Sequence, residues 1–260
     1  MKTDKGKIET IDQVIDVLGH IISDSEKQNE ASGYFAALYQ KVTIKVKEGI
    51  ANNYFDDGPR MEKLDVIFAL RYIDAYYAWK NNQPVTQSWQ CAFDLSSLYQ
   101  PIVFQHLLIG MNAHINLDLG IAAAEVSKDK DITNLQADFN KINEILSSLV
   151  VEVQSNLAEI WPTLKFLLKL SGKVDDFMVD FSMKLARNGA WKFATKMANC
   201  KIDEWDKQIE ERDMKIAKKA NLVSSPGLIA SAIFLIIRLG ERGSVAKKIS
   251  RLKYQIKLIS

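Results

Sequence analysis

Residues 105–120 read QHLLIGMNAHINLDLG and belong to a longer stretch, residues 95–117, that contains no Lys, Arg, Asp or Glu. A charge-free stretch of this length matches a membrane-spanning helix. The stretch nevertheless carries a proline and several polar side chains that would be costly facing lipid. These are Gln100, Pro101, Gln105, His106, Asn112, His114 and Asn116. We therefore expect the central helix of a soluble bundle, which is apolar on all sides because it is buried on all sides.

The segments on both sides of this stretch also have helical spacing of apolar residues. Ile8–Ile22, Ser32–Ile50, Met61–Trp79 and Ile202–Asn221 each repeat apolar residues every three or four positions. Strand-like alternation is confined to Lys41–Lys47, which lies inside a good helical pattern. With 47% hydrophobic and 25% charged residues, the composition is that of a globular protein. The pattern predicts one all-α domain over residues 1–260, a bundle of about ten helices around the buried apolar helix.

The charge balance, the cysteines and the N-terminal segment limit the possible functions. The chain has 34 basic and 32 acidic residues, so nothing in its overall charge indicates nucleic-acid binding. Its two cysteines, Cys91 and Cys200, cannot make a disulfide scaffold and fit no metal-binding spacing. Residues 1–13 have no apolar core of the kind found in signal peptides, which predicts a cytoplasmic protein.

Polar side chains on the apolar helix are the most informative feature of the sequence. His106, Gly110, His114 and Asp118 follow one another at intervals of four residues, and His114 and Asp118 are neighbours one turn apart. Gly110 is expected to leave room between the two histidines. Asn112 and Asn116 form a second such pair on nearly the opposite side. Buried polar groups need hydrogen-bond partners, from neighbouring helices or from a ligand.

The run 105–120 resembles the signature of an uncharacterised bacterial family, domain of unknown function 5995. The segment Phe68–Ala75, with Trp89 and Phe93 after it, is also similar to that family, as is Tyr54–Asp57 with Leu64 and Asp65. The resemblance covers most of the chain and is best over residues 35–143. It implies no reaction, substrate or cofactor. It does imply that the His/Asn/Asp cluster and Arg71 belong together.

Three interpretations of the cluster are open. It can be a buried hydrogen-bond network in which Arg71 neutralises Asp118 or Asp65. It can be a divalent-metal site in which His114 and Asp118 supply two ligands. Further ligands would then have to come from His106, Asp57, Asp65 or Asp176. Or it can be a metal-free acid/base site, with His114 as general base and its tautomer fixed by a carboxylate.

The third interpretation assigns roles to named residues. The catalytic candidates are His114, Asp118, His106 and Arg71, where the planar guanidinium of Arg71 would bind a carboxylate or phosphate of the substrate. The candidates for binding the ligand are Asn112, Asn116, Asp65, Tyr72, Trp89 and Phe93. The function expected is that of an enzyme acting on a small, partly apolar molecule that can carry an anionic group. A non-catalytic carrier of such a ligand is the first alternative.

Another alternative is a magnesium-dependent enzyme similar to class I terpene synthases. Residues 175–180 read DDFMVD, which is similar to the aspartate motif of those all-α enzymes. Asn143, Ser147 and Glu152 resemble their second metal motif, but the glutamate is one residue late and the two motifs come in the wrong order.

The C-terminal part of the chain suggests a role at a surface. Leu228–Ile237 is apolar but too short to span a bilayer, and core packing is the favoured interpretation. Residues 241–260 hold six Lys or Arg and one Glu, and a basic helix is expected over Val245–Leu258. This helix could mediate dimerisation. An alternative function is therefore that of a membrane-peripheral interaction protein that binds anionic lipid through residues 228–258.

Overall fold

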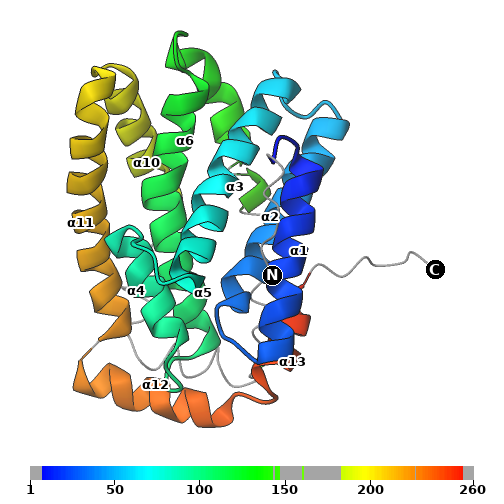
Figure 1. The fold of residues 1–260 in the computed structure, drawn as a ribbon, viewed down its shortest axis with the longest axis vertical. Coiled ribbons are helices and arrows are strands. Elements are labelled where there is room, and N and C mark those ends of the chain that lie inside the picture. The colour runs from blue at the N-terminus through cyan, green and yellow to red at the C-terminus, as the bar shows by residue number, and fades with distance from the viewer. Residues whose placement is uncertain (1–7, 143, 147–159, 161–182, 226, 254–260) are drawn as a thin grey trace.

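The computed structural model describes residues 8–142, 144–146, 160, 183–225 and 227–253. These residues form α-helices, short 3-10 segments and turns, without a strand, which confirms the predicted all-α bundle (Figure 1). The helices with defined bounds are α1 (Ile11–Gln28), α2 (Gly33–Ala51), α3 (Gly58–Lys80), α4 (Gln87–Ser96), α5 (Val103–Ala113), α6 (Leu119–Val126), α10 (Met183–Ala198), α11 (Trp205–Ser224), α12 (Leu228–Gly240) and α13 (Val245–Leu252).

Side-chain caps fix where several of these helices begin. Thr10 and Gln13 form a capping box at the start of α1, each side chain accepting from the backbone of the other. The Asp57 carboxylate accepts from the Arg60 backbone N–H at the start of α3, whose first turn contains Pro59. Ser244 caps α13 in the same way by accepting from the Lys247 N–H.

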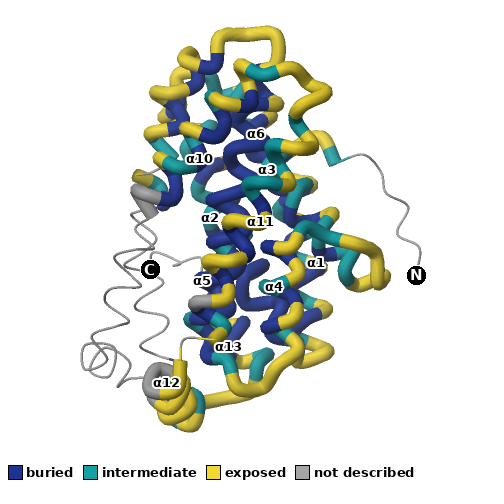
Figure 2. Tube along the Cα trace, turned by 90° about the vertical axis from the view of Figure 1, so that its left-hand side faces the viewer, coloured by how far each residue is buried: buried dark blue, intermediate teal, exposed yellow. Residues whose placement is uncertain are grey.

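The apolar stretch forms the central helix of the bundle, as predicted. α5 and α6 are continuous through a short π-helical segment, η1 (His114–Asp118), and the combined helix runs from Val103 to Val126. It is long and apolar enough to cross a membrane, but 94% of its most apolar window is buried inside the structure. The central position of α5 and α6 is visible in Figure 2 as an almost unbroken buried trace. This burial fits the core helix of a soluble protein.

The π turn changes which neighbours the central helix meets. The Leu119 N–H donates to the His114 carbonyl, five residues back, instead of the usual four. α2 and α4 pack on α5, whereas α3 and α10 pack on both η1 and α6. α11 packs along α4, α5 and η1. The two histidines and Asp118 therefore lie between helices from both the N-terminal and the C-terminal parts of the chain.

Gly110 does not leave open room between the histidines, contrary to expectation. The Phe35 ring of α2 occupies the space over Gly110, because a Cβ atom added there would lie 2.4 Å from Phe35 Cδ2. The missing side chain thus permits α2 to approach α5 closely, and it brings an aromatic ring against the helix that carries the histidines.

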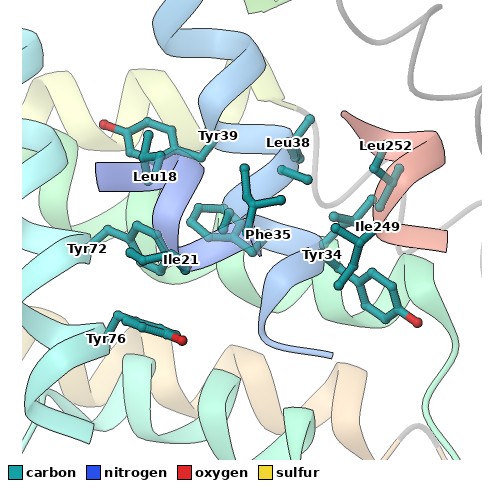
Figure 3. Close-up of a cluster of buried hydrophobic side chains, with 14 of the residues drawn as sticks. Leu18, Ile21, Tyr34, Phe35, Leu38, Tyr39, Tyr72, Tyr76, Ile249 and Leu252 are labelled. Carbon is teal, nitrogen blue, oxygen red and sulfur yellow. The ribbon is translucent and has the colours of Figure 1, made fainter. Parts of the chain in front are cut away.

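The C-terminal helices behave differently from each other. In α13, Ile249 and Leu252 are buried beside Tyr34 and Leu38 of α2 (Figure 3), so this apolar stripe packs within the chain. α12 lies across one end of the bundle (Figure 1). Its large apolar residues Leu228, Leu235, Ile236 and Leu239 are exposed. The expectation that this segment is a core helix is therefore wrong for most of its described side chains.

Several predicted features lie outside the described residues. They are the aspartate motif at residues 175–180, the residues that resemble a second metal motif (Asn143, Ser147 and Glu152), and the end of the basic helix beyond Lys253.

Replacing Gly110 by alanine tests the close contact with Phe35. Because the new methyl group meets a ring in a packed core, we expect Gly110→Ala to destabilise the protein by about 2 kcal/mol or more. Gly58→Ala is the control, since its Cβ would meet only Ile50 Cγ2 at 3.4 Å. That change should stay within about 1 kcal/mol of the wild type. Urea unfolding measures both, and equal effects would contradict the packing role of Gly110.

Candidate functional site

The carboxylate of Asp118 organises the centre of the bundle. It lies at the end of η1, is fully buried, and accepts hydrogen bonds from three different elements. Arg71 Nε of α3 donates to Oδ1 at 3.2 Å, and Trp89 Nε1 of α4 donates to Oδ2 at 2.8 Å. His114 Nδ1 lies 3.1 Å from Oδ2. A buried carboxylate requires such compensation, and here an indole, a guanidinium and an imidazole provide it together.

These contacts fix the tautomer of His114. The ring is buried, and burial lowers the pKa of His114 below its ordinary value of 6.5, although the hydrogen bond to Asp118 acts in the opposite direction. The neutral imidazole therefore donates its Nδ1 proton to Asp118 and keeps a lone pair on Nε2. Nε2 is buried and has no hydrogen-bond partner among the described residues. His114 thus presents an unprotonated nitrogen that is available as a base.

Aromatic side chains surround the His114 ring. Phe68 stacks on it with the ring centroids 3.6 Å apart and an interplanar angle of 8°. Tyr39 meets it edge-on with centroids 4.4 Å apart. Phe35, Trp89 and Tyr72 complete the enclosure at 5.6, 5.9 and 6.2 Å. The enclosure is apolar apart from hydroxyl and indole groups, so the strength of any charge interaction within it is increased.

Phe93 lies one layer further from His114. Its ring stacks between Trp89 and Trp79, at centroid distances of 5.4 and 4.8 Å. It supports Trp89, which in turn holds Asp118.

Asp65 is the second buried carboxyl group of this region. It shares one face of α3 with Phe68 and Tyr72, which are three and seven residues further along and both contact His114. Burial, with a smaller contribution from Glu62, raises the pKa of Asp65 to about 8. Asp65 Oδ2 has no hydrogen-bond partner within the described part of the chain. At neutral pH Asp65 is therefore a buried, protonated acid.

The structure places His106 away from His114, at the other end of α5. It lines a cleft of about 610 Å³ together with Trp79 of α3, Tyr99 of the loop between α4 and α5, Arg238 of α12 and Lys248 of α13. Burial, with contributions from Arg238 and Lys248, lowers the pKa of His106 to about 3. Glu241 lies in the same cleft and accepts from Lys248 Nζ at 2.6 Å. His106 is thus a neutral residue of a second site and does not join the Asp118 cluster.

Asn112 and Asn116 form the predicted pair, but they face α11. Asn116 Nδ2 donates to Asn112 Oδ1 at 3.2 Å, and Asn112 Nδ2 donates to the Ile216 carbonyl at 3.1 Å. Arg212 Nε donates to the Asn116 carbonyl at 3.0 Å. These bonds join the central helix to α11, and they leave the two amides apart from the dyad of His114 and Asp118.

The described residues contain no group of three or more His, Cys, Asp or Glu side chains placed to hold a metal ion. Asp57 is committed to capping α3, His106 lies elsewhere, and Asp176 is outside the described residues. A metal at His114 and Asp118 would also compete with Arg71 and Trp89 for the carboxylate. The metal site stays a prediction.

Sequence reasoning missed four residues that matter for the site. Phe35, Tyr39 and Phe68 enclose His114, and Arg187 of α10 is buried with Nε and Nη1 unpaired among the described residues. Burial lowers the pKa of Arg187 to about 10. Phe35 and Tyr39 are one turn apart on α2, a signal that the sequence did contain, but it indicated only an apolar helix face. Arg187 lies one turn before Trp191, a spacing that permits stacking of the guanidinium on the indole and indicates a structural role, but it does not reveal that the guanidinium is buried.

Comparison with known proteins gives a family and no activity. The profile of a family of unknown function, DUF5995, matches residues 11–226, so this chain belongs to that family. No curated protein and no solved structure matches the chain.

Replacing Trp89 by phenylalanine tests the bond to the buried carboxylate. Hydrogen bonds to charged groups stabilise proteins by about 2 kcal/mol, so Trp89→Phe should cost at least that much in urea unfolding. Trp79→Phe is the control, because Trp79 also stacks on Phe93 but forms no hydrogen bond to a carboxylate of the described residues. If the two variants lose equal stability, the Trp89 bond to Asp118 does not contribute as inferred.

The raised pKa of Asp65 predicts how the stability of the protein depends on pH. Its pKa is raised in the folded state, so its contribution to stability is complete below about 3.8 and is lost as pH rises toward about 8. Between about pH 7.5 and 8, His106 and His114 are almost fully deprotonated in both states, because the ordinary histidine pKa is 6.5 and burial lowers it further in the folded protein. The free energy of unfolding should therefore fall by up to about 1.4 kcal/mol per pH unit in this window. Asp65→Asn should flatten the dependence, and an unchanged slope in that variant would contradict the assignment.

Proposed function

We propose that this chain, as a member of that family of unknown function, is an enzyme that catalyses a proton-transfer reaction on a small, partly apolar, anionic molecule. His114 would act as general base through Nε2, and Asp65 as general acid. Asp118 would hold His114 in its reactive tautomer. The observation that carries the proposal is the buried, neutral His114, whose Nδ1 is bound to Asp118 and whose Nε2 is unpaired among the described residues.

The environment separates the proton affinities of the two groups as acid/base catalysis requires. Burial lowers the pKa of His114 and raises that of Asp65 to about 8, so near neutral pH the base is free and the acid is protonated. Pairs of groups whose pKa values are moved apart in this way are typical of acid/base sites. Tyr39 lies against the His114 ring, and burial, with a contribution from Asp65, raises the pKa of its hydroxyl.

Two arginines support an anionic substrate. Arg71 lies at the margin of the site, with its side chain 31% exposed, and it uses Nε for Asp118. Its remaining guanidinium nitrogens have no hydrogen-bond partner among the described residues and could bind a carboxylate or phosphate. Arg187 belongs to α10, which packs against η1, and is a buried cation that an anion would stabilise.

Access to the dyad is shortest beside α3. Phe68 and Arg71 border His114 and Asp118, and both are half-buried rather than buried. A substrate that displaced the Phe68 ring would reach His114 directly, and its apolar part would contact Tyr72 and Trp89.

A carrier that binds the same ligand without reaction is the second candidate function, favoured by the aromatic rings that surround His114. A cytoplasmic location is part of the proposal.

Deuterium exchange can detect the proposed reaction before its product is known. A panel of small aromatic and aliphatic carboxylates and phosphate monoesters is first screened for thermal stabilisation of the wild type. Compounds that bind are then incubated in D₂O, and exchange of carbon-bound hydrogen or formation of product is followed by proton NMR. His114→Gln and Asp65→Asn should abolish the reaction while binding is retained. Arg71→Met should lower the affinity for anionic compounds by about tenfold or more.

The controls separate the enzyme from the alternatives. His20 is exposed, so His20→Gln should leave binding and reaction unchanged. Compounds that bind but undergo neither exchange nor conversion indicate a carrier. Nitrogen-15 NMR of His114 gives a test that needs no ligand, since the proposal requires a neutral ring protonated on Nδ1. A cationic ring, or one protonated on Nε2, would overturn it.

A further inference from the structure

The outer face of α12 is mostly apolar. Among the side chains of α12 that the structure describes, the exposed ones follow helical spacing, form one stripe and carry no charge; they are Leu228, Ser231, Ala232, Leu235, Ile236 and Leu239. Leu228 is 92% exposed and Leu239 is 76% exposed. The side of α12 that meets the protein is also apolar, since Ile237 is buried and Phe234 packs on the core. A surface helix normally turns polar residues toward solvent, so this face is unusual.

A neighbouring loop extends the same surface. Leu98 and Tyr99, between α4 and α5, are both exposed. Arg238 fixes this loop beside α12, because its Nε donates to the Tyr99 carbonyl at 2.7 Å and its guanidinium lies 4.4 Å from the centre of the Tyr99 ring. We call the surface made by the exposed stripe of α12 with Leu98 and Tyr99 the α12 face. Figure 2 shows α12 as an exposed element at the end of the bundle.

Basic residues border the α12 face. Lys218 and Lys219 lie in the last two turns of α11, just before α12, and Arg242 and Lys247 follow it. All four are exposed, and none forms an ion pair with a described residue. The nearby Glu241 is already neutralised by Lys248 and Arg238. The border of the apolar face is therefore positively charged.

We propose that the α12 face binds the surface of an anionic lipid bilayer. Helix α12 would lie flat in the interface, with Leu228, Leu235 and Leu239 among the acyl chains and the basic border against the lipid headgroups. Its 13 residues are too few to span the bilayer, but its position across the end of the bundle suits this orientation (Figure 1).

A second copy of the chain is a less suitable partner. In a symmetric dimer through this face, each copy would place its Lys218, Lys219, Arg242 and Lys247 around the same patch on its partner. Like charges would then meet around the contact, and no exposed acidic group of the face would compensate them. Anionic headgroups complement the same border.

Vesicle co-sedimentation of the full-length protein tests the proposal. The wild type should sediment with vesicles of equal parts phosphatidylcholine and phosphatidylglycerol at low salt, and only weakly with phosphatidylcholine alone. Ile236→Ser with Leu239→Ser should lower the affinity for anionic vesicles by about tenfold or more, because two large apolar side chains are lost from the lipid contact. Arg242→Gln with Lys247→Gln should lower it by about tenfold and reduce its salt dependence.

Matched controls lie at the opposite end of α11. Ile202 is 60% exposed, close to the 58% of Ile236, and Lys207 is exposed on the first turns of α11. Ile202→Ser and Lys207→Gln should bind vesicles like the wild type. Absence of wild-type binding, equal binding to both lipid compositions, or equal losses in the control variants would each overturn the proposal. So would a wild-type dimer that Ile236→Ser with Leu239→Ser converts to a monomer, without vesicle binding.

Discussion

The buried carboxylate of Asp118 is the group on which the arrangement of the bundle centre depends. A charge in an apolar interior is tolerated only where donors surround it, and each donor here comes from a different part of the chain. α3 must therefore place Arg71, α4 must place Trp89, and the π turn must place His114, all toward one point. The aromatic packing then follows, because Phe68 and Tyr72 share a face of α3 with Arg71 nearby, and Trp89 brings Phe93 behind it.

The same constraint explains why the central helix is irregular. In an uninterrupted α-helix, the side chains that face α3 and those that face α11 would keep the same helical register along the whole length. The π turn at His114–Asp118 inserts one residue into the turn and so changes the register between α5 and α6. On one side His114 and Asp118 meet α3 and α4, and on the other Asn112 and Asn116 bind α11. Two polar pairs on a nearly charge-free helix thereby find partners on opposite sides.

The sequence predicted the helices and the polar pairs better than the identity of their partners. Apolar periodicity gave the extents of α2 and α3 to within about three residues, whereas α1 continues for six residues beyond the predicted end at Ile22. The i, i+4 spacing correctly predicted the contacts of His114 with Asp118 and of Asn112 with Asn116. It could not show that His106 belongs to another cleft, because helical spacing does not say which neighbours a face meets. It also could not show that Phe35 fills the space over Gly110, since that contact joins residues 75 positions apart. For α12, hydrophobicity alone does not distinguish a core helix from one that turns an apolar face outward.

The proposed acid/base role gives a reason for the incomplete pairing of this cluster. Packing and folding favour pairing every buried polar group, and Asp118 follows that rule with three donors. Asp65 Oδ2 and His114 Nε2 have no such partner among the described residues. The hydrogen bond from Nδ1 could have been made while Nε2 also found a partner, for instance a hydroxyl on α2 or α3. Instead aromatic rings surround the imidazole, and burial lowers the pKa of His114 below its ordinary value. Unpaired buried groups of opposite proton affinity cost stability, and the acid/base chemistry proposed above would account for their retention.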